Sequence, residues 1–226
     1  MLAISATSAW RDAHPGAAIG LLELAGAEQT GSAARLEERK RATEALLRQR
    51  YGGWSRQDLL ALPVMAAYAR YYRRFKKTYH VQLQVESIVL KGRNLLAVTP
   101  LVDANFCAEV DTLILTAGHD ADRLLEPVCM DVSVPGDRQT LMSGEPKDIL
   151  AGDMVMRDAG GMCCSIIYGQ DHRSPISPET THALYVAYAP AGVPAEQVER
   201  QLRQIEANVR LFSPGAILEQ ITVIRA

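Results

Sequence analysis

The stretch Met154-Val-Met-Arg-Asp-Ala-Gly-Gly-Met-Cys-Cys-Ser-Ile-Ile-Tyr168 decides the fold class of this chain. Its two halves are mainly apolar and of strand length, and Asp158-Ala-Gly-Gly161 between them is a turn signal. So short a connection joins neighbouring antiparallel strands, because parallel strands need a longer crossover. Three more apolar stretches in this half are predicted strands: Val128–Val134, Ala183–Ala189 and Ile217–Ile224.

Helical patterns dominate the residues that precede these strands. Ser32 is a candidate N-cap for a helix that ends at Gly52-Gly53. Ser55-Arg-Gln-Asp58 fits a variant capping box for a second helix, Leu59–Lys77. Helices over Leu101–Leu115 and Glu196–Phe212 follow from their apolar spacing, and Ala18–Leu24 is typical of a buried strand. Helices in front and strands behind predict an α+β fold rather than a doubly wound parallel sheet.

One stretch supports two interpretations. Val81, Leu83 and Val85 alternate with polar residues, which predicts a strand on periodicity alone. Ile88-Val-Leu90 breaks this alternation, so a helix remains open.

Composition limits the class of protein. The 226 residues are 48% hydrophobic and 22% charged, which is typical of a globular chain and excludes disordered, collagen-like and low-complexity proteins. No apolar run is long enough for a membrane-spanning helix, and Arg11 and Asp12 follow the first residues too closely for a secretory signal. Four cysteines without a framework pattern favour reduced thiols in a cytoplasm. We expect an N-terminal part, residues 1–80, packed on a core domain of residues 81–226.

Positive charge is concentrated early in the chain. Between Ala33 and Lys77, twelve Lys and Arg face only four acids, although the net charge of the whole chain is −2. Within this segment, Arg70–His80 interleaves cations with aromatic residues, a pattern that suits nucleic acid. The candidate RNA-binding residues are Arg70, Arg73, Arg74, Lys76 and Lys77. The alternative is an amphipathic helix whose aromatic residues, Tyr68, Tyr72 and Phe75, belong to the core.

Several kinds of site are absent from the sequence. There is no phosphate loop, dinucleotide fingerprint or nucleophile elbow, and we expect no cofactor. The five histidines form no zinc signature, so we expect no metal. Cys163 and Cys164 are adjacent on a predicted strand, so they point to opposite faces and one is expected in the core.

Two polar segments place a histidine beside a carboxylate. One is Thr116-Ala-Gly-His119-Asp120, and the other is Gly169-Gln-Asp171-His172-Arg173-Ser174. We expect both at the ends of regular elements, where loops carry working groups on a rigid scaffold. A histidine there can act as a general base. The alternative is structural: Asp120 as a helix cap, and Asp171 and Ser174 as turn formers.

Three segments, in their order and spacing, resemble the B3/B4 domain, the editing module of the bacterial phenylalanyl-tRNA synthetase β-subunit, in its free-standing form. They are Leu101-Val-Asp-Ala-Asn105, Gly118-His-Asp120 and the Asp171–Thr181 segment. The similarity covers roughly residues 81–226. It implies an α+β fold with a strand-rich core and flanking helices, in which Val81–Leu90 is more helical than its alternation suggests. In the synthetase the domain hydrolyses the ester of wrongly charged tRNA, typically tyrosine on the phenylalanine tRNA.

By this analogy the site combines two groups of residues. The candidate catalytic residues are His119, His172 and Asp171, with one histidine activating water and Asp171 orienting a histidine or binding the α-amino group. The candidate substrate-binding residues are Asn105, Glu109, Asp120, Arg173, Ser174 and Thr181. This sequence has Gly169-Gln-Asp171 where the family has a Gly-Gly-Glu segment, so the specificity carboxylate is unassigned.

These residues lead to one main hypothesis and two alternatives. The main hypothesis is a tRNA- or RNA-binding editing domain that hydrolyses mischarged aminoacyl-tRNA in trans. The first alternative is a non-catalytic B3/B4 module that binds nucleic acid, a free amino acid or another small molecule. The second is a small-molecule enzyme that reuses the pocket. The sequence gives no oligomeric state.

Overall fold

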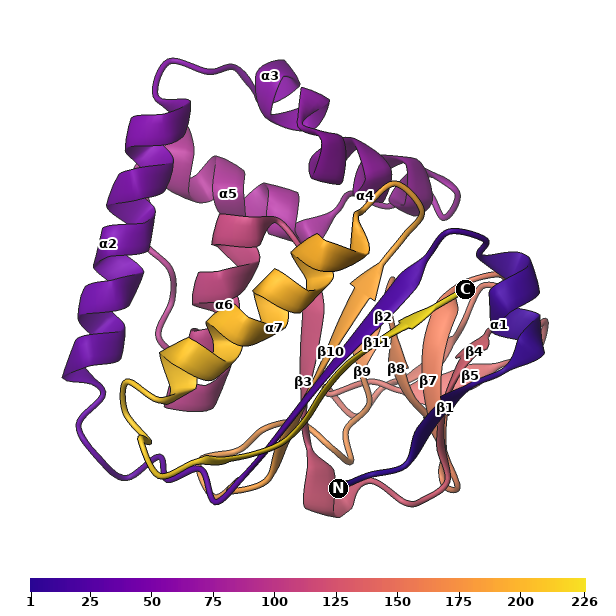
Figure 1. Cartoon of the computed structure of the whole chain (residues 1–226). Helices are drawn as coiled ribbons and strands as arrows, with labels where there is room; N and C mark the ends of the chain where they lie inside the picture. The colour runs from indigo at the N-terminus through magenta and orange to yellow at the C-terminus, as the bar shows by residue number, and fades with distance from the viewer.

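A computed structural model describes residues 1–226 and shows two β-sheets with helices on their outer sides (Figure 1). The fold is α+β with mixed sheets and flanking helices, as the sequence predicts. One buried apolar cluster runs from Trp10 to Ala216 and joins the layers. No helix has the length and apolar composition needed to cross a bilayer.

The first sheet is four-stranded and fully antiparallel. Its order is β11 (Ile217–Arg225), β2 (Ala18–Ala25), β10 (Ala183–Ala189) and β3 (Thr116–Asp120). Every residue of β10 and nearly every residue of β2 is buried, which explains why both read as continuous apolar runs. Since β2 lies between β10 and β11, the first 80 residues supply a central strand of this sheet.

The second sheet contains the predicted hairpin. Its order is β1 (Ile4–Ala6), β4 (Val128–Val132), β7 (Met154–Asp158), β8 (Gly161–Ser165) and β9 (Gly169–Gln170). The β7–β8 pair is antiparallel, as the turn at Asp158–Gly161 predicts, and only β1 runs parallel to its neighbour. A separate hairpin, β5 (Arg138–Thr140) with β6 (Pro146–Asp148), projects beside it. The short helix α1 (Ser8–Ala13) follows β1, and a 3₁₀ turn (Ala121–Arg123) follows β3.

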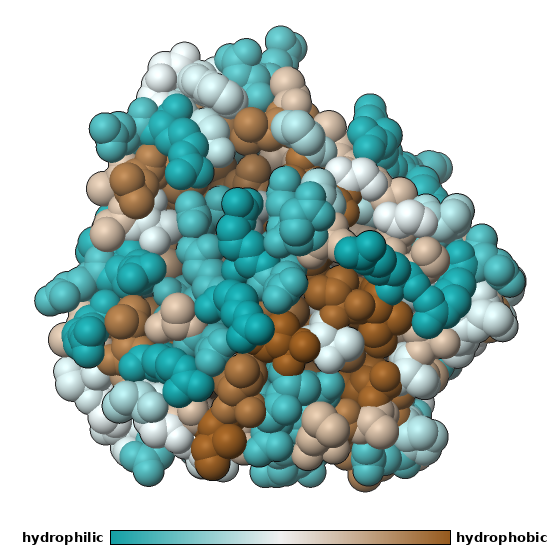
Figure 2. Space-filling view, viewed as in Figure 1, coloured by the Kyte–Doolittle hydropathy of each residue, from teal (hydrophilic) through white to brown (hydrophobic).

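Helices cover one face of the first sheet. The amphipathic helix α7 (Ala195–Val209) crosses β2, β10 and β11, with its polar side outward (Figures 1 and 2). Gly20 on β2 allows this close approach, because a Cβ there would lie 2.5 Å from a Val198 methyl group. Behind α7 lie α6 (Pro100–Thr112) and α2 (Ala34–Tyr51), and α2 ends at Gly52 as predicted.

The predicted helix Leu59–Lys77 is two helices, α3 (Arg56–Ala61) and α4 (Pro63–Arg73). The break comes at Leu62-Pro63, because proline disfavours helical geometry in the preceding residue. The capping box at Ser55 and Asp58 is confirmed. Tyr68, Tyr72 and Phe75 are buried, so their assignment to the core is also confirmed.

The alternating stretch after Tyr79, for which both strand and helix were open, is a helix, α5 (His80–Val89), as the family resemblance implies. Its polar residues Gln82 and Glu86 are buried and bonded to each other across one helical turn, which periodicity cannot reveal. Thr116–Asp120 is not a loop but strand β3, because its polar residues find buried partners.

Candidate functional site

A cavity of about 270 Å³ lies at the β3 edge of the first sheet, between that sheet and the second. Helix residues from α5 and α6 form one side, and the segment from β8 to β9 forms the other. Met142, from the loop between β5 and β6, closes part of the mouth. The cavity lining therefore unites residues that lie far apart in the sequence, which is a common arrangement for small-molecule sites.

Glu109 is the acidic group of this lining. Its side chain is buried, and Oε1 accepts a hydrogen bond of 2.7 Å from the Thr116 backbone N–H. Oε2 has no hydrogen-bond partner within the protein. Burial raises the pKa of Glu109 to about 8, because the charged carboxylate is poorly solvated there. At neutral pH, Glu109 is therefore mainly a carboxylic acid that can donate as well as accept a hydrogen bond.

Most of the remaining wall is apolar, including Phe106, Leu115 and Ile166. Cys164 also lines the wall, but burial raises the pKa of its thiol to about 12, so it is not a thiolate at neutral pH. His80 lies at the rim, with its Nδ1 3.2 Å from the Tyr72 hydroxyl. Desolvation lowers the pKa of His80, which favours the neutral imidazole that a general base requires.

The structure brings the two predicted polar segments together. Thr116 and Gly169 at their starts line the cavity, but His119, Asp171 and Ser174 do not. His119 Nδ1 lies 2.8 Å from Ser174 Oγ, and Ser174 Oγ donates to Asp171 Oδ1 at 3.1 Å. All three side chains are buried, and burial lowers the pKa of His119 to about 4. The serine lies between the histidine and the aspartate, whereas a nucleophilic triad places the histidine in the middle. In this arrangement the three residues join β3 to the segment after β9.

Arg173 and His172 follow the same segment. The Arg173 guanidinium binds Asp158 through both Nη atoms, at 3.0 and 3.2 Å, and binds Asp171 through Nε at 2.5 Å. Gly160 gives it room, since a Cβ there would clash with the guanidinium. His172 is exposed, and its ring makes no hydrogen bond with the protein. The Arg173 guanidinium therefore already binds two carboxylates of the protein, and the His172 ring lies on the surface without a hydrogen-bond partner.

The other substrate-binding candidates are Asn105, Asp120 and Thr181. Asn105 donates from Nδ2 to the Thr116 carbonyl, and its buried Oδ1 has no partner. Asp120 caps the 3₁₀ turn, and its other oxygen accepts from the Thr180 hydroxyl at 2.8 Å. Thr181 is exposed and contributes only its carbonyl, to the Ala27 N–H. Of the six substrate-binding candidates, Glu109 is the one that lines the cavity.

The basic candidates form an exposed strip along α4 and the turn after it, which we call the α4 strip: Arg70, Arg73, Arg74, Lys76 and Lys77. None of them has a carboxylate within 4.0 Å, whereas most arginines elsewhere in the chain are paired. Lys77 Nζ lies 5.7 Å from the Tyr168 ring centre, and Lys147 Nζ lies 5.4 Å from the same ring. Because Tyr168 precedes Gly169 of the lining, the strip ends beside the cavity.

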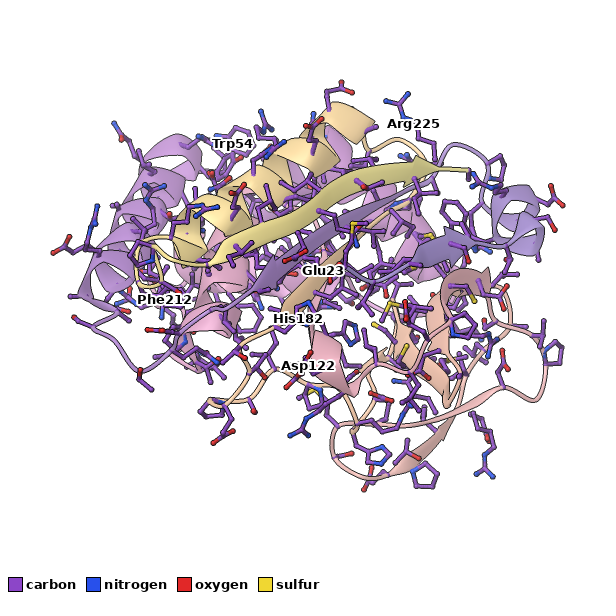
Figure 3. All side chains as sticks on the ribbon, turned by 60° about the horizontal axis from the view of Figure 1, so that its bottom comes forward. Glu23, Trp54, Asp122, His182, Phe212 and Arg225 are labelled. Atoms are coloured by element: carbon purple, nitrogen blue, oxygen red, sulfur yellow. The ribbon has the colours of Figure 1, made fainter.

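Sequence reasoning missed His80, Tyr168 and Lys147 as parts of this rim. They belong to three separate segments, so only the fold relates them. It also missed a polar cluster in which His182 lies between Glu23 and Asp122, as Figure 3 shows. His182 Nε2 is 2.9 Å from Glu23, and Nδ1 is 2.8 Å from Asp122. Glu23 also accepts from the Leu2 N–H, so this cluster anchors the N-terminal segment.

Comparison with known proteins gives only a weak structural similarity. No protein-family model and no curated protein sequence matches this chain. Among solved structures it is similar to an N-terminal fragment of the phenylalanyl-tRNA synthetase β-subunit from Pyrococcus horikoshii, with 7% sequence identity and a TM-score of 0.47. The match covers 100% of this chain and 57% of that one, so this chain spans little more than half of the fragment.

Proposed function

We propose that this protein is an editing-type esterase that binds the aminoacylated end of a tRNA and hydrolyses mischarged aminoacyl-tRNA in trans. The observation that carries the proposal is a cavity with a protonated acid on its wall and unpaired cations beside its mouth. The cavity suits an amino-acid side chain, and the α4 strip suits the phosphates of an RNA. The sequence resemblance to B3/B4 editing domains supports the same chemistry.

The cavity wall suggests how the amino acid is selected. A volume of about 270 Å³ with an apolar wall accepts a side chain of moderate size. Glu109 then offers a hydrogen bond to a hydroxyl or carbonyl on that side chain. An amino acid without such a group leaves the buried acid without its partner, so the site disfavours it strongly. Polar amino acids are therefore the preferred substrates.

His80 is the imidazole at the rim of the cavity, so we assign it the role of general base. In this scheme His80 accepts a proton from a water molecule as the water oxygen attacks the ester carbonyl. The tetrahedral intermediate then collapses, and the bond to the ribose oxygen breaks. The proton held by His80 passes to that oxygen, which leaves free amino acid and uncharged tRNA.

One observation favours a second candidate function, a non-catalytic binding module. The histidine–carboxylate groups of this chain, at His119 and His182, both lie outside the cavity, and the partner of His80 is a tyrosine hydroxyl. A histidine base whose second ring nitrogen binds no carboxylate is less strongly oriented. On this alternative the same cavity holds an amino acid, free or on tRNA, without hydrolysing it.

Deacylation separates the two candidates. The protein is incubated with a panel of correctly charged and mischarged tRNAs, and release of labelled amino acid is followed. Hydrolysis confined to a mischarged species with a polar amino acid supports the esterase. Salt-sensitive tRNA binding without hydrolysis supports the binding module. Neither result with any tRNA overturns the esterase and limits the binding module to a free amino acid.

Two matched pairs of variants test the residues. Glu109→Met keeps the side-chain volume but removes its hydrogen bonds, and Glu199→Met on the exposed face of α7 is its control. His80→Ala is expected to lower kcat by about 10²–10⁴ with a smaller effect on KM, while His172→Ala leaves both unchanged. If His80→Ala retains full activity and His172→Ala does not, the base is the surface histidine and our assignment of His80 is wrong.

A further inference from the structure

A second pocket, of about 260 Å³, lies on the other side of α4 from the Tyr68–Tyr79 stack that joins α4 to α5. We call it the α1–α4 pocket. It is lined by the end of α1 with the following turn, by α4 and by the turn after β10, and its lining includes His14, Arg70, Tyr71 and Arg74. Its lining contains two guanidinium groups and no carboxylate, and it shares no residue with the cavity of Glu109.

Arg70 and Arg74 are one helical turn apart, so they lie on the same face of α4. Neither has a carboxylate within 4.0 Å, so their like charges converge on one pocket without compensation from the protein. An acid under this face, Asp153, is fully buried and bound to the Tyr71 hydroxyl at 2.6 Å. Its carboxyl does not line the pocket.

Arg74 is held in place by its neighbours. It lies over the rings of Tyr71 and Phe75, at 5.3 and 5.5 Å from their centres, and donates to the Gly152 carbonyl. Arg70 occupies the space beside Gly192, where a Cβ would lie only 2.8 Å from its Nη2. Gly192 has φ +99°, so it meets both the turn geometry and the need for space. Because Arg74 is preorganised in this way, it loses less entropy when it binds an anion.

His14 provides an independent indication of a ligand. It lies at the end of α1, only 6% exposed, and its buried Nε2 has no hydrogen-bond partner in the protein. Burial and the nearby Arg74 charge lower the pKa of His14 to about 4, so its ring is neutral. An unpartnered buried nitrogen is costly. His14 carries it in the wall of a pocket whose lining already contains two cations without a carboxylate partner.

We propose that the α1–α4 pocket binds a phosphate group, with Arg70 and Arg74 as its cationic donors and His14 as a third hydrogen-bond partner. Guanidinium groups bind phosphate oxygens through two parallel N–H groups, which suits two arginines on one helix face. A neutral imidazole adds a hydrogen bond without adding charge. The phosphate belongs either to an RNA backbone or to a small phosphorylated molecule, and the chemistry of binding is the same in both cases.

Titration with inorganic phosphate tests the site. The wild-type protein should show a saturable rise in Tm, because a ligand of the folded state raises apparent stability. Arg70→Gln and Arg74→Gln should each reduce phosphate affinity at least tenfold. Arg73→Gln is the matched control, since Arg73 is exposed on the same helix, has no ion pair and does not line this pocket. Absence of a saturable response, or an equal loss in Arg73→Gln, overturns the proposal.

Two further readouts identify the source of the phosphate and the role of His14. If RNA supplies it, Arg70→Gln and Arg74→Gln weaken binding of a short single-stranded RNA more than Arg73→Gln, and inorganic phosphate competes with the RNA. If a small molecule supplies it, Arg70→Gln and Arg74→Gln lower phosphate affinity but weaken RNA binding no more than Arg73→Gln does. In nitrogen-15 spectra, the ring signals of His14 should move on phosphate addition and those of exposed His172 should not. None of these measurements uses aminoacyl-tRNA, so their outcome does not depend on whether the protein is an esterase.

Discussion

The protonated state of Glu109 makes a prediction about stability against pH. An exposed glutamate has a pKa near 4.5, and burial raises that of Glu109 to about 8. Between these values the folded protein keeps a proton that the unfolded chain releases. Folding therefore becomes less favourable as pH rises through this window, and the cost is complete above pH 8. At 1.36 kcal/mol per pH unit, the interval amounts to about 5 kcal/mol.

Glu109→Gln isolates this contribution. The amide has the shape of the protonated acid and does not titrate, so its free energy of unfolding lacks the slope due to Glu109. All other groups titrate in both proteins, and their contributions cancel in the difference. We expect the variant to gain about 5 kcal/mol relative to wild type between pH 4.5 and pH 8.

Urea unfolding followed by circular dichroism at pH 5, 6, 7 and 8 measures this difference. The carbon-13 shift of the Glu109 carboxyl gives the pKa independently. A difference that stays constant with pH, together with a carboxyl that titrates near 4.5, would refute the reasoning. The cavity would then contain a carboxylate at neutral pH and would favour a cationic ligand group over a hydroxyl.

Other structural features give three further predictions. Burial lowers the pKa of His119 to about 4. Between pH 6.5 and 4 only the unfolded chain takes up the proton, so the folded protein loses stability as pH falls through this range. His119→Gln should therefore flatten the acid side of the curve of unfolding free energy against pH, measured by urea unfolding. The carboxylates around His182 raise its pKa, so the protonated ring stabilises the folded protein at low pH. This stabilisation is lost as pH rises through the raised pKa. His182→Gln should therefore destabilise the protein more at pH 5.5 than at pH 9. Gly20→Ala should cost about 1–3 kcal/mol by overpacking against α7, and an unchanged urea midpoint would show that the helix can move away.

The elements predicted best are those in which local pattern and final burial agree. The β7–β8 hairpin follows from its turn, and α7 follows from an apolar stripe that is buried on β2, β10 and β11. The residue pattern does not identify α5, because the polar side chains of Gln82 and Glu86 are buried and hydrogen-bonded to each other. A polar residue is read from sequence as exposed, and only the tertiary structure shows its partner.

The candidate site was predictable only in part, for a related reason. The sequence places His119 and Asp171 in polar segments, and these segments do meet, but they meet as a sealed structural contact. The functional groups of the cavity are Glu109 and His80. In the sequence, Glu109 is one acid on a helix, and His80 is the last residue of a basic stretch. Nothing in their local sequence separates them from solvated residues. Their proximity is produced by α5, α6 and β3 packing at one edge of the sheet.

The α4 strip shows how one helical register can produce two separate binding surfaces. Tyr68 and Tyr72 are a helical turn apart and both are buried, which fixes the rotation of α4 against the core. The neighbouring positions then point to either side. Arg70 and Arg74 line the α1–α4 pocket, while Arg73 and Lys77 line a groove between α3, α4 and α5.

These two pairs of cations differ in what surrounds them. The first pair converges on a pocket that also contains the buried His14, which suits a single phosphate group. The second pair lines a groove that continues from Lys77 to Tyr168 and the cavity, which suits a chain of phosphates that ends there. Neutralising the second pair should therefore reduce the salt dependence of RNA binding even if the first pair binds an unrelated phosphate. A salt slope unchanged by Arg73→Gln with Lys77→Gln would place the RNA on another face and remove the link between the α4 strip and the cavity.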